Sequence, residues 1–309
     1  MTQPLSDDGI LCDRPTSVKM EKRIPHRNQQ SDPDPAMPHR GSPGTGFDPA
    51  HPALVRAGRA AFGDGFRLRS VARTASTQDA VRAAARAGAA PGTCWVAAEQ
   101  SSGRGRQGRA WEAPAGTALL TSVLLRPAGP LGWVPLAAGL AVIDALRSCA
   151  RVEARLKWPN DVLAEGGRKL AGLLAEVEPR APRRSAPAVV LGIGLNLGVE
   201  HFPAGIAGAS LHRLTDPLPP PLPEEVLAAL LTALTPRLAQ VGAGQAGLDR
   251  LRADWKASAT GLGATVRAVT PGGELHGVAT GLDADGALLI TDPAGTVHRL
   301  VAGDVHTVS

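Results

Sequence analysis

The chain has 309 residues, of which 43% are hydrophobic and 20% charged, and this balance excludes a fibrous or wholly disordered protein. Its 33 basic and 28 acidic residues give a formal net charge of +5, which permits a polyanionic partner but does not require one. The three cysteines, Cys12, Cys94 and Cys149, form no CxxC pair, and their odd number excludes both a disulfide framework and a zinc site with cysteine ligands.

The N-terminal segment, residues 1–60, contains nine prolines and mixed charges without sustained apolar periodicity. This composition favours a disordered, proline-rich leader, and a translation start at Met20 or Met37 stays open as an alternative. The segment has no apolar signal-peptide core, and no apolar run in the chain reaches the roughly 18 residues of a membrane span. We therefore expect a cytoplasmic protein without a membrane partner.

Residues 61–258 alternate short apolar runs with helical patterns, which predicts an α/β or α+β domain. Ser76 or Thr77 is placed to cap a helix that runs through residue 87, and Gly88 is placed to end it. Further helices are expected over residues 135–150, 224–241 and 248–257, and strands over residues 95–98, 118–125, 170–177 and 188–197.

From Gly261 onward the pattern indicates β-structure alone. Four strands, ATVRAV, ELHGVATGL, ALLIT and TVHRLV, are separated by PGG, DADG and DPAG turns. This predicts a small C-terminal barrel over residues 261–309.

The most informative segment is EQSSGRGRQGRAW, residues 99–111, where glycines alternate with arginines: Gly103, Arg104, Gly105, Arg106, Gly108 and Arg109. Glycine lets backbone N–H groups approach a phosphate, and guanidinium groups offer forked donors that match phosphate or carboxylate oxygens. Trp111 adds a flat face suited to stacking on a base. On composition alone, a solvated basic loop or an RGG-like nucleic-acid segment explains the pattern equally well.

Three further segments indicate chemistry only weakly by themselves. RLKWPNDV, residues 155–162, places Lys157 beside the helix-breaking Pro159, where a strand is expected to end. A single cation at such a turn is more often a surface group than a catalytic one. The basic pair at 168–169 is interpreted in the same way, as the charged start of a buried strand. Residues 192–196 contain two glycines, and glycine in a strand relieves crowding more often than it contacts a ligand.

Four motifs occur in an order and at separations that resemble biotin protein ligase, the family that attaches biotin to a lysine of biotin-dependent carboxylases: GRGRQGRAW, KWPNDV, RKLAGLLAE and GIGLNL. The joint match is specific, and the resemblance covers about residues 66–309. It implies an α+β fold, with a catalytic domain similar to class II aminoacyl-tRNA synthetases, a mixed sheet backed by helices, and a small C-terminal SH3-like β-barrel. The first 60 residues show no two apolar-periodic helices, so we expect a monofunctional ligase without an N-terminal DNA-binding domain.

The resemblance implies a two-step reaction with biotin and ATP as substrates and Mg²⁺ accompanying ATP. Biotin and ATP give biotinyl-5′-AMP and pyrophosphate, and a lysine of a biotin carboxyl carrier domain then attacks the mixed anhydride and releases AMP. In the first step two anions must meet, so positioned cations lower the barrier, and the ionised carboxylate needs no general base. The carrier domain is the expected partner, a homodimer is allowed, and no specific DNA partner is expected.

The resemblance also implies a role for each matching residue. Lys157 and Arg106 are expected to be catalytic, stabilising the carboxylate and phosphoryl oxygens. The expected biotin-binding set is Ser76, Thr77, Gln78, Gln100, Arg104, Gly105, Arg106 and Lys157, and the expected nucleotide-binding set is Arg106, Arg109, Trp111 and Asn196. Gln78 is one methylene longer than the asparagine of the family's usual Ser-Thr-Asn, which leaves its role open. Asp161 could help to hold Mg²⁺ through water, but Mg²⁺ is commonly coordinated by substrate phosphates, so no protein metal ligand is expected.

Three other functions are weighed against this one. A lipoate or octanoate ligase or transferase shares the architecture. A pocket for a fatty chain is expected to be lined by apolar side chains rather than by the hydrogen-bonding groups of Ser76, Thr77 and Gln100. A biotin-responsive repressor would need a DNA-binding domain. A nonspecific RNA-binding module would need stacked aromatic residues, whereas aromatic residues make up 3% of the chain and none is tyrosine.

Overall fold

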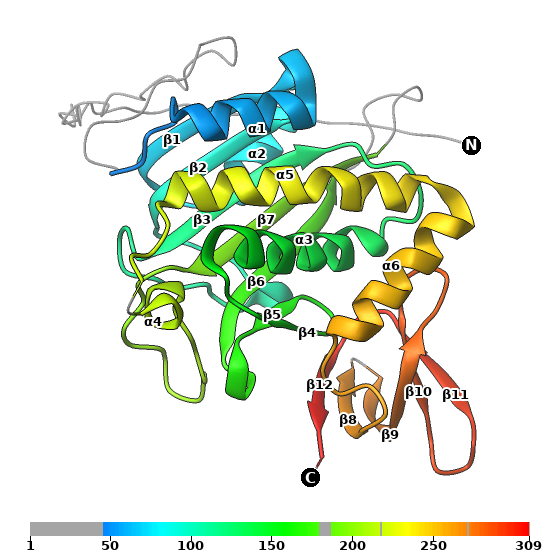
Figure 1. Cartoon of the computed structure of the whole chain (residues 1–309). Helices are drawn as coiled ribbons and strands as arrows, with labels where there is room; N and C mark the ends of the chain where they lie inside the picture. Colours follow the sequence, from blue (N-terminus) through cyan, green and yellow to red (C-terminus); the bar gives the residue numbers. More distant parts are fainter. Residues whose placement is uncertain (1–45, 179–186, 217, 271, 309) are drawn as a thin grey trace, which may run out of the picture. The chain divides into compact units, whose positions relative to one another are not determined.

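The centre of the structure is a seven-stranded sheet in the order β1-β2-β3-β7-β6-β5-β4 (Figure 1). The computed structural model describes residues 46–178, 187–216, 218–270 and 272–308. The strands of this sheet are β1 Arg67–Thr74, β2 Thr93–Gln100, β3 Ala118–Leu125, β4 Arg155–Lys157, β5 Asp161–Leu163, β6 Lys169–Glu178 and β7 Ala188–Asn196. β1 and β2 pair in parallel, and the other neighbours are antiparallel. The sheet is therefore mixed, which confirms the fold that the resemblance implied.

Helices cover both faces of the sheet. One layer consists of α1 Pro52–Phe62, α3 Trp133–Ala150 and α5 Pro223–Gly242, followed by α6 Gly244–Ser258, and a short α4 Leu211–Thr215 lies in the connection after β7. α2 Thr77–Arg86 packs on the opposite face, where Val81 contacts Leu124 and Val190. β3 is buried at every position because alternate side chains of a strand point to opposite faces, and both faces are covered here.

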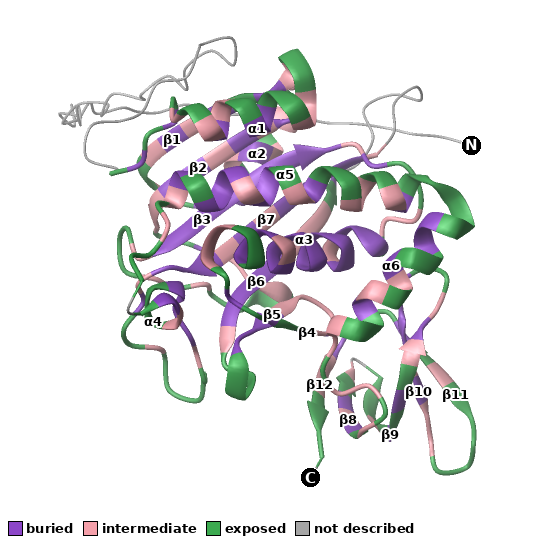
Figure 2. Ribbon diagram, viewed as in Figure 1, coloured by how far each residue is buried: buried purple, intermediate pink, exposed green. Residues whose placement is uncertain are grey.

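The main core helix is α3. Figure 2 shows it buried along most of its length. By length and composition this helix could cross a membrane, yet 72% of it is buried inside the protein. Of its two charged residues, Asp144 accepts a hydrogen bond from Arg237 of α5 at 2.8 Å, and Arg147 pairs with Glu153. The apolar composition of α3 is therefore that of a core helix.

The helix α1 corrects the expectation of a leader that extends to residue 60. Leu54 is fully buried, Ala57 is also buried, and Phe47 joins the same core cluster. The prolines misled the prediction because Pro52 stands in the first turn of the helix, where its missing N–H costs nothing and its fixed φ favours helix formation. The leader expectation is therefore wrong for residues 52–60. Residues 46–51 lead into the helix, with Phe47 buried, and residues 1–45 lie outside the described residues.

The C-terminal part is an antiparallel sheet in the order β11-β10-β9-β8-β12. Its strands are β8 Thr265–Thr270, β9 Gly273–Leu282, β10 Leu288–Thr291, β11 Val297–Leu300 and β12 Asp304–Thr307. The all-β prediction is confirmed, and β12 is an addition to the four expected strands. Its short sequence has no apolar alternation, and β12 forms because the chain returns to pair with β8.

The turn between β9 and β10 joins this sheet to the catalytic part. The indole of Trp133 in α3 donates a hydrogen bond to the Ala284 carbonyl at 2.8 Å, and that of Trp158 donates to the Gly286 carbonyl at 3.3 Å. The guanidinium of Arg252 in α6 donates to the Asp283 carbonyl of the same turn at 3.3 Å and lies 5.7 Å from the centre of the Trp133 ring. These contacts fix the C-terminal sheet beside strands β4 and β5.

Candidate active site

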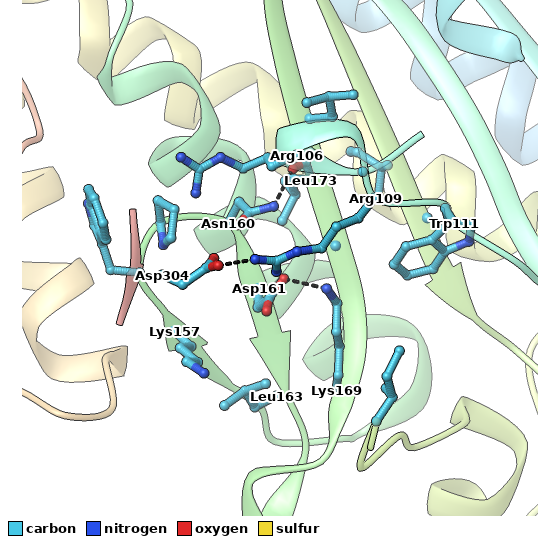
Figure 3. Close-up of a pocket in the computed structure, with 18 of the residues that line it drawn as sticks. Arg106, Arg109, Trp111, Lys157, Asn160, Asp161, Leu163, Lys169, Leu173 and Asp304 are labelled. Atoms are coloured by element: carbon cyan, nitrogen blue, oxygen red, sulfur yellow. Dashed lines mark hydrogen bonds and ion pairs between the residues drawn. The ribbon is translucent and has the colours of Figure 1, made fainter. Parts of the chain in front are cut away.

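A cavity of about 990 Å³ lies between the start of α2, the loop of residues 103–111 (the glycine–arginine loop), strands β4 to β7 and strand β12 (Figure 3). Its volume is at the upper end of the roughly 300–1,000 Å³ typical of small-molecule sites. The cavity is lined by every site residue that the sequence singled out: Ser76, Thr77, Gln78, Gln100, Arg104, Gly105, Arg106, Arg109, Trp111, Lys157 and Asn196. The fold therefore brings together residues that are up to 120 positions apart in the chain.

The start of α2 forms a polar, buried end of the cavity. Ser76 is the N-cap residue, and its hydroxyl accepts a hydrogen bond from the Asp79 amide at 3.4 Å. The backbone amide of Thr77 donates to Gln100 Oε1 at 2.7 Å, and the Thr77 hydroxyl lies 2.8 Å from that of Ser122. These hydrogen bonds fix hydroxyl and amide groups in place, which suits a polar ring that is recognised by hydrogen bonds.

Gln78 fills a space next to Gly192 under this end of the cavity. Its Nε2 donates to the Val190 carbonyl at 2.9 Å and to the Leu174 carbonyl at 3.3 Å, while its Oε1 accepts from Ser122 at 3.1 Å. A Cβ atom added at Gly192 would lie 2.5 Å from Gln78 Oε1. The glycine thus makes room for the longer side chain, and the amide of Gln78 joins α2 to β6 and β7.

The glycine–arginine loop folds back on itself through backbone hydrogen bonds. The Trp111 amide donates to the Gly103 carbonyl at 2.9 Å, and the Gly105 amide donates to the Arg109 carbonyl at 2.7 Å. Gln107, with φ 56°, and Gly108, with φ 74°, make the turn at its tip. Backbone hydrogen bonds therefore fix the base of the loop, and its tip is exposed.

The three arginines of the loop have different surroundings. Arg104 is neutralised by two carboxylates, with its Nη2 at 2.5 Å from Asp79 Oδ1 and 3.4 Å from Glu176 Oε2. Arg109 is exposed and paired with Asp304 of β12, as Figure 3 shows. Arg106 is half-buried, and its guanidinium has no ion-pair partner among the residues that the structure describes.

Burial gives Arg106 its electrostatic character. It lowers the pKa of the guanidinium, the carboxylate of Asp161 opposes this shift, and Arg109 adds to it. The pKa of His306 on β12 is lowered first by burial and then by the positive charges of Lys157, Arg267 and Arg109. Lys157, Arg267 and Arg109 thus place positive charges near His306 at the β12 side of the cavity, which suits an anionic ligand.

Trp111 lies flat on the sheet. A Cβ atom added at Gly194 would be 2.5 Å from its Cε2 atom, and one added at Gly172 would be 2.8 Å from its Cζ3 atom. The ammonium of Lys169 stands 5.5 Å from the ring centre. The interpretation that the strand glycines relieve crowding is correct at Gly194. The side chain for which Gly194 makes room is Trp111, which itself lines the cavity.

Lys169 is a site residue that the sequence interpretation missed. Its Nζ forms an ion pair with Asp161 Oδ1 at 2.7 Å and lines the cavity, as Figure 3 shows. By contrast, Lys157 has no ion-pair partner within the described part of the chain. The available signal was the position of Lys169 in the RKLAGLLAE motif, which places a cation at the first residue of β6, opposite the hairpin of β4 and β5.

Asp161, the residue considered as a water-mediated Mg²⁺ ligand, forms its ion pair with Lys169. The described residues contain no group of three or more histidine, cysteine or acidic side chains that could hold a metal ion.

Asn196 lines the cavity but uses its amide group within the protein. The side-chain NH₂ donates to the carbonyls of Lys169 at 3.2 Å and Ala209 at 3.1 Å. The backbone of Lys169 in turn donates to Ala207 and accepts from Ala209. Asn196 thus holds residues 207–209 against the start of β6, where Lys169 stands.

Comparisons with known proteins agree with this architecture. The sequence matches the Biotin/lipoate A/B protein ligase family over residues 70–196 and the Biotin protein ligase C terminal domain over residues 261–306. A biotin–[acetyl-CoA-carboxylase] ligase of Mycobacterium tuberculosis is 39% identical over 253 residues, covering 79% of this chain and 90% of the relative. One of Paracoccus denitrificans is 39% identical over 219 residues, covering 66% of this chain and 86% of the relative.

A solved structure supports the same assignment. The biotin protein ligase of Aquifex aeolicus, in complex with biotin and ATP, superposes with a TM-score of 0.66 at 26% identity and covers 78% of this chain and 99% of its own. These matches confirm the resemblance of the four motifs. The chain belongs to the biotin protein ligase family.

Proposed function

We propose that this protein joins biotin to ATP, forming biotinyl-5′-AMP, and transfers the biotinyl group to a lysine of a biotin carboxyl carrier domain. Two relatives at 39% identity are named as ligases of acetyl-CoA carboxylase, and the Aquifex aeolicus structure holds biotin and ATP. The observation that carries the proposal is a single cavity with a hydrogen-bonding end at Ser76 and Thr77 and cations at its centre.

In the first step a biotin carboxylate oxygen attacks the α-phosphorus of ATP, and the bond to pyrophosphate breaks. Both reactants are anionic, so cations without their own carboxylate partner offer the largest stabilisation. Arg106 and Lys157 are such cations within the described residues. Lys169 faces the same space and shares its charge with Asp161. We assign these three side chains to the carboxylate and phosphoryl oxygens.

In the second step the neutral ε-amine of the carrier lysine attacks the carbonyl carbon of the anhydride. An amide bond forms, the bond to AMP breaks, and the amine loses a proton. Water competes with the amine, so the glycine–arginine loop has to cover the intermediate. Trp111, lying flat on β6 and β7, is placed to cover the adenine, with Arg109 and Asn196 on the same nucleotide side.

The test is incubation of the protein with biotin, Mg-ATP and a carrier domain, following both pyrophosphate release and mass gain of the carrier. We expect both signals with biotin and neither with lipoate. Mass gain with lipoate but not biotin would overturn the proposal, and pyrophosphate release without mass gain would restrict it to the first step.

The cellular setting follows from this activity. A carboxylase carrier domain is the partner, the cytoplasm is the compartment in which that partner is made, and neither a membrane nor a specific DNA operator is needed. A gel shift at stated salt with the protein's own promoter tests the last point, because nonspecific binding falls steeply with salt. Sedimentation with and without biotin and ATP tests whether a homodimer forms.

A further inference from the structure

Four polar side chains form a hydrogen-bonded network at the end of the cavity where α2 begins. The network runs from Gln100 on β2 through Thr77 and Ser122 to Gln78. Thr77, Gln78 and Ser122 are only 3%, 4% and 1% exposed, and all four residues line the cavity. A hydroxyl carries a single proton, so the partners of each group determine which of two neighbours donates.

Gln78 is the fixed end of this network. Its Nε2 donates to the Val190 carbonyl at 2.9 Å and to the Leu174 carbonyl at 3.3 Å, so the amide nitrogen faces two acceptors. In the opposite orientation the amide oxygen would face both carbonyl oxygens with no proton between them. The oxygen of Gln78 therefore points toward Ser122, and in that position it can only accept a hydrogen bond.

The direction of the hydroxyl protons follows from this orientation. Ser122 Oγ lies 3.1 Å from Gln78 Oε1 and gives its one proton to that oxygen. The 2.8 Å contact between the hydroxyls of Ser122 and Thr77 then requires the proton of Thr77. In the reverse order, Ser122 would donate to Thr77, and the buried oxygen of Gln78 would lose its donor within the network. Burial of an unsatisfied acceptor costs free energy, so the first order is favoured.

This order makes the hydroxyl of Thr77 an acceptor toward any ligand. Its oxygen lies 3.1 Å from Gln100 Oε1, which already accepts the Thr77 amide at 2.7 Å. Because the hydroxyl proton of Thr77 is used by Ser122, two acceptor oxygens stand side by side without a proton between them. An N–H group of a ligand can satisfy both oxygens, whereas an oxygen atom in the same place would be repelled.

We propose that Gln78 is a positioning residue that makes this end of the cavity selective for a ring N–H of a cyclic urea. Gln78 acts through Ser122 and Thr77, whose proton order it sets, and it does not touch the reacting atoms. The inference rests on the proposed biotin-activating function, since the cyclic urea of biotin carries two ring N–H groups. A saturated fatty chain offers no such donor. A cyclic carbamate, in which oxygen replaces one ring N–H, offers one donor fewer.

The test is calorimetric measurement of the dissociation constant, without ATP, for biotin and for the two biotin carbamates in which oxygen replaces one or the other ring N–H. The wild-type protein is expected to bind one of the two carbamates about 100-fold more weakly than biotin, because an unpaired acceptor would face the pair of oxygens. Gln78→Met keeps the length of the side chain but accepts hydrogen bonds only weakly. In this variant the ratio is expected to fall to about tenfold, because Thr77 becomes free to donate to the ligand.

A second variant breaks the network in its middle. Ser122→Ala removes the acceptor of the Thr77 proton, and it is expected to lower the ratio to about tenfold, with no further fall in the double variant, because both changes break one network. Val81→Ala is the control, since Val81 is fully buried on the same helix and packs with Leu124 without lining the cavity. It is expected to lower the melting temperature and to keep the wild-type ratio.

A purely structural role of Gln78 would weaken the binding of biotin and of both carbamates by the same factor. An unchanged ratio in Gln78→Met and Ser122→Ala would therefore overturn the inference, as would a wild-type protein that binds biotin and both carbamates equally. A protein that shows the expected ratios but forms no biotinyl-5′-AMP would refute the proposed function and support the role of Gln78. Binding is measured without turnover, so the two failures are distinguishable.

Discussion

At the scale of single residues, two lysines in one cavity differ in their partners. Lys169 shares its charge with Asp161, whereas Lys157 has no carboxylate partner in the described residues. Removing Lys169 takes away the ion-pair partner of Asp161, whose negative charge then acts on Arg106 without that counter-charge. In the proposed first step we therefore expect the two lysines to contribute in different ways.

Lys157→Ala and Lys169→Ala are each expected to slow pyrophosphate release by about 10²–10³-fold, as is typical when one stabilising group of a transition state is lost. Circular dichroism should show that both variants fold. Lys256→Ala, an exposed position on α6, is the control and should keep wild-type activity. Full activity of either cavity variant would falsify the assignment of that lysine.

Arg106 has no carboxylate partner in the described residues and is half-buried beside the cavity, so it is placed to retain the intermediate. Arg106→Gly is expected to release biotinyl-5′-AMP into solution. The measurement is biotinylation of an unrelated protein with exposed lysines, present together with the carrier domain. Label confined to the carrier in this variant would show that Arg106 does not hold the intermediate.

At the scale of elements, the platform for Trp111 depends on glycines in two neighbouring strands. Gly194→Ala places a Cβ 2.5 Å from the indole and is expected to lift the ring off β7. Overpacking of this kind costs about 1–3 kcal/mol in a closed core, and a half-exposed ring relieves it by moving. The effect should therefore appear as a rise of the KM for ATP, measured by pyrophosphate release. Gly281→Ala on β9, where an added Cβ meets nothing within 4 Å, is the control.

Elements with strong local signals were predictable from sequence. The helix capped by Ser76 and the strand over residues 118–125 are confirmed with close boundaries, because a cap residue and a mainly apolar run are local features. The helix α1 and strand β12 were not predicted. Proline in a first turn looks like a helix breaker in a sequence, and a short polar strand forms only because its partner β8 is nearby.

At the scale of the whole molecule, the reactivity of the buried thiol of Cys94 measures how often the sheet unfolds. It is 1% exposed on β2, and burial raises the pKa of its thiol to about 12, with a hydrogen bond to Thr121 opposing the shift. Since the thiolate is the reactive form and its pKa lies far above 8, Cys94 should remain unlabelled by iodoacetamide at pH 8 until the protein unfolds. Mass spectrometry of peptides distinguishes it from the half-buried Cys149. Rapid labelling of Cys94 in the native protein would contradict this burial.

The whole molecule also assembles the site from distant parts. Arg109 of the glycine–arginine loop pairs with Asp304, which lies 195 positions further along on β12. Asp304 stands on β12, which pairs with β8 of the C-terminal sheet, and Trp133 of α3 donates a hydrogen bond to the turn of that sheet at Ala284. Nothing in the local pattern around Asp304 indicates a partner, so its place in the cavity could not be predicted.

The sequence alone determined the family through its four motifs, and the resemblance then implied the mixed sheet with helices and the site residues, although Lys169 and Asp304 were missed. Local periodicity predicted the all-β C-terminal part, because it reports which faces are buried. Only the tertiary structure decided how the charges are paired: Arg104 with Asp79 and Glu176, Lys169 with Asp161, and Arg109 with Asp304. A charge has the same appearance in a sequence whether it is paired or free, and which of the two it becomes depends on which strands and helices the topology makes neighbours.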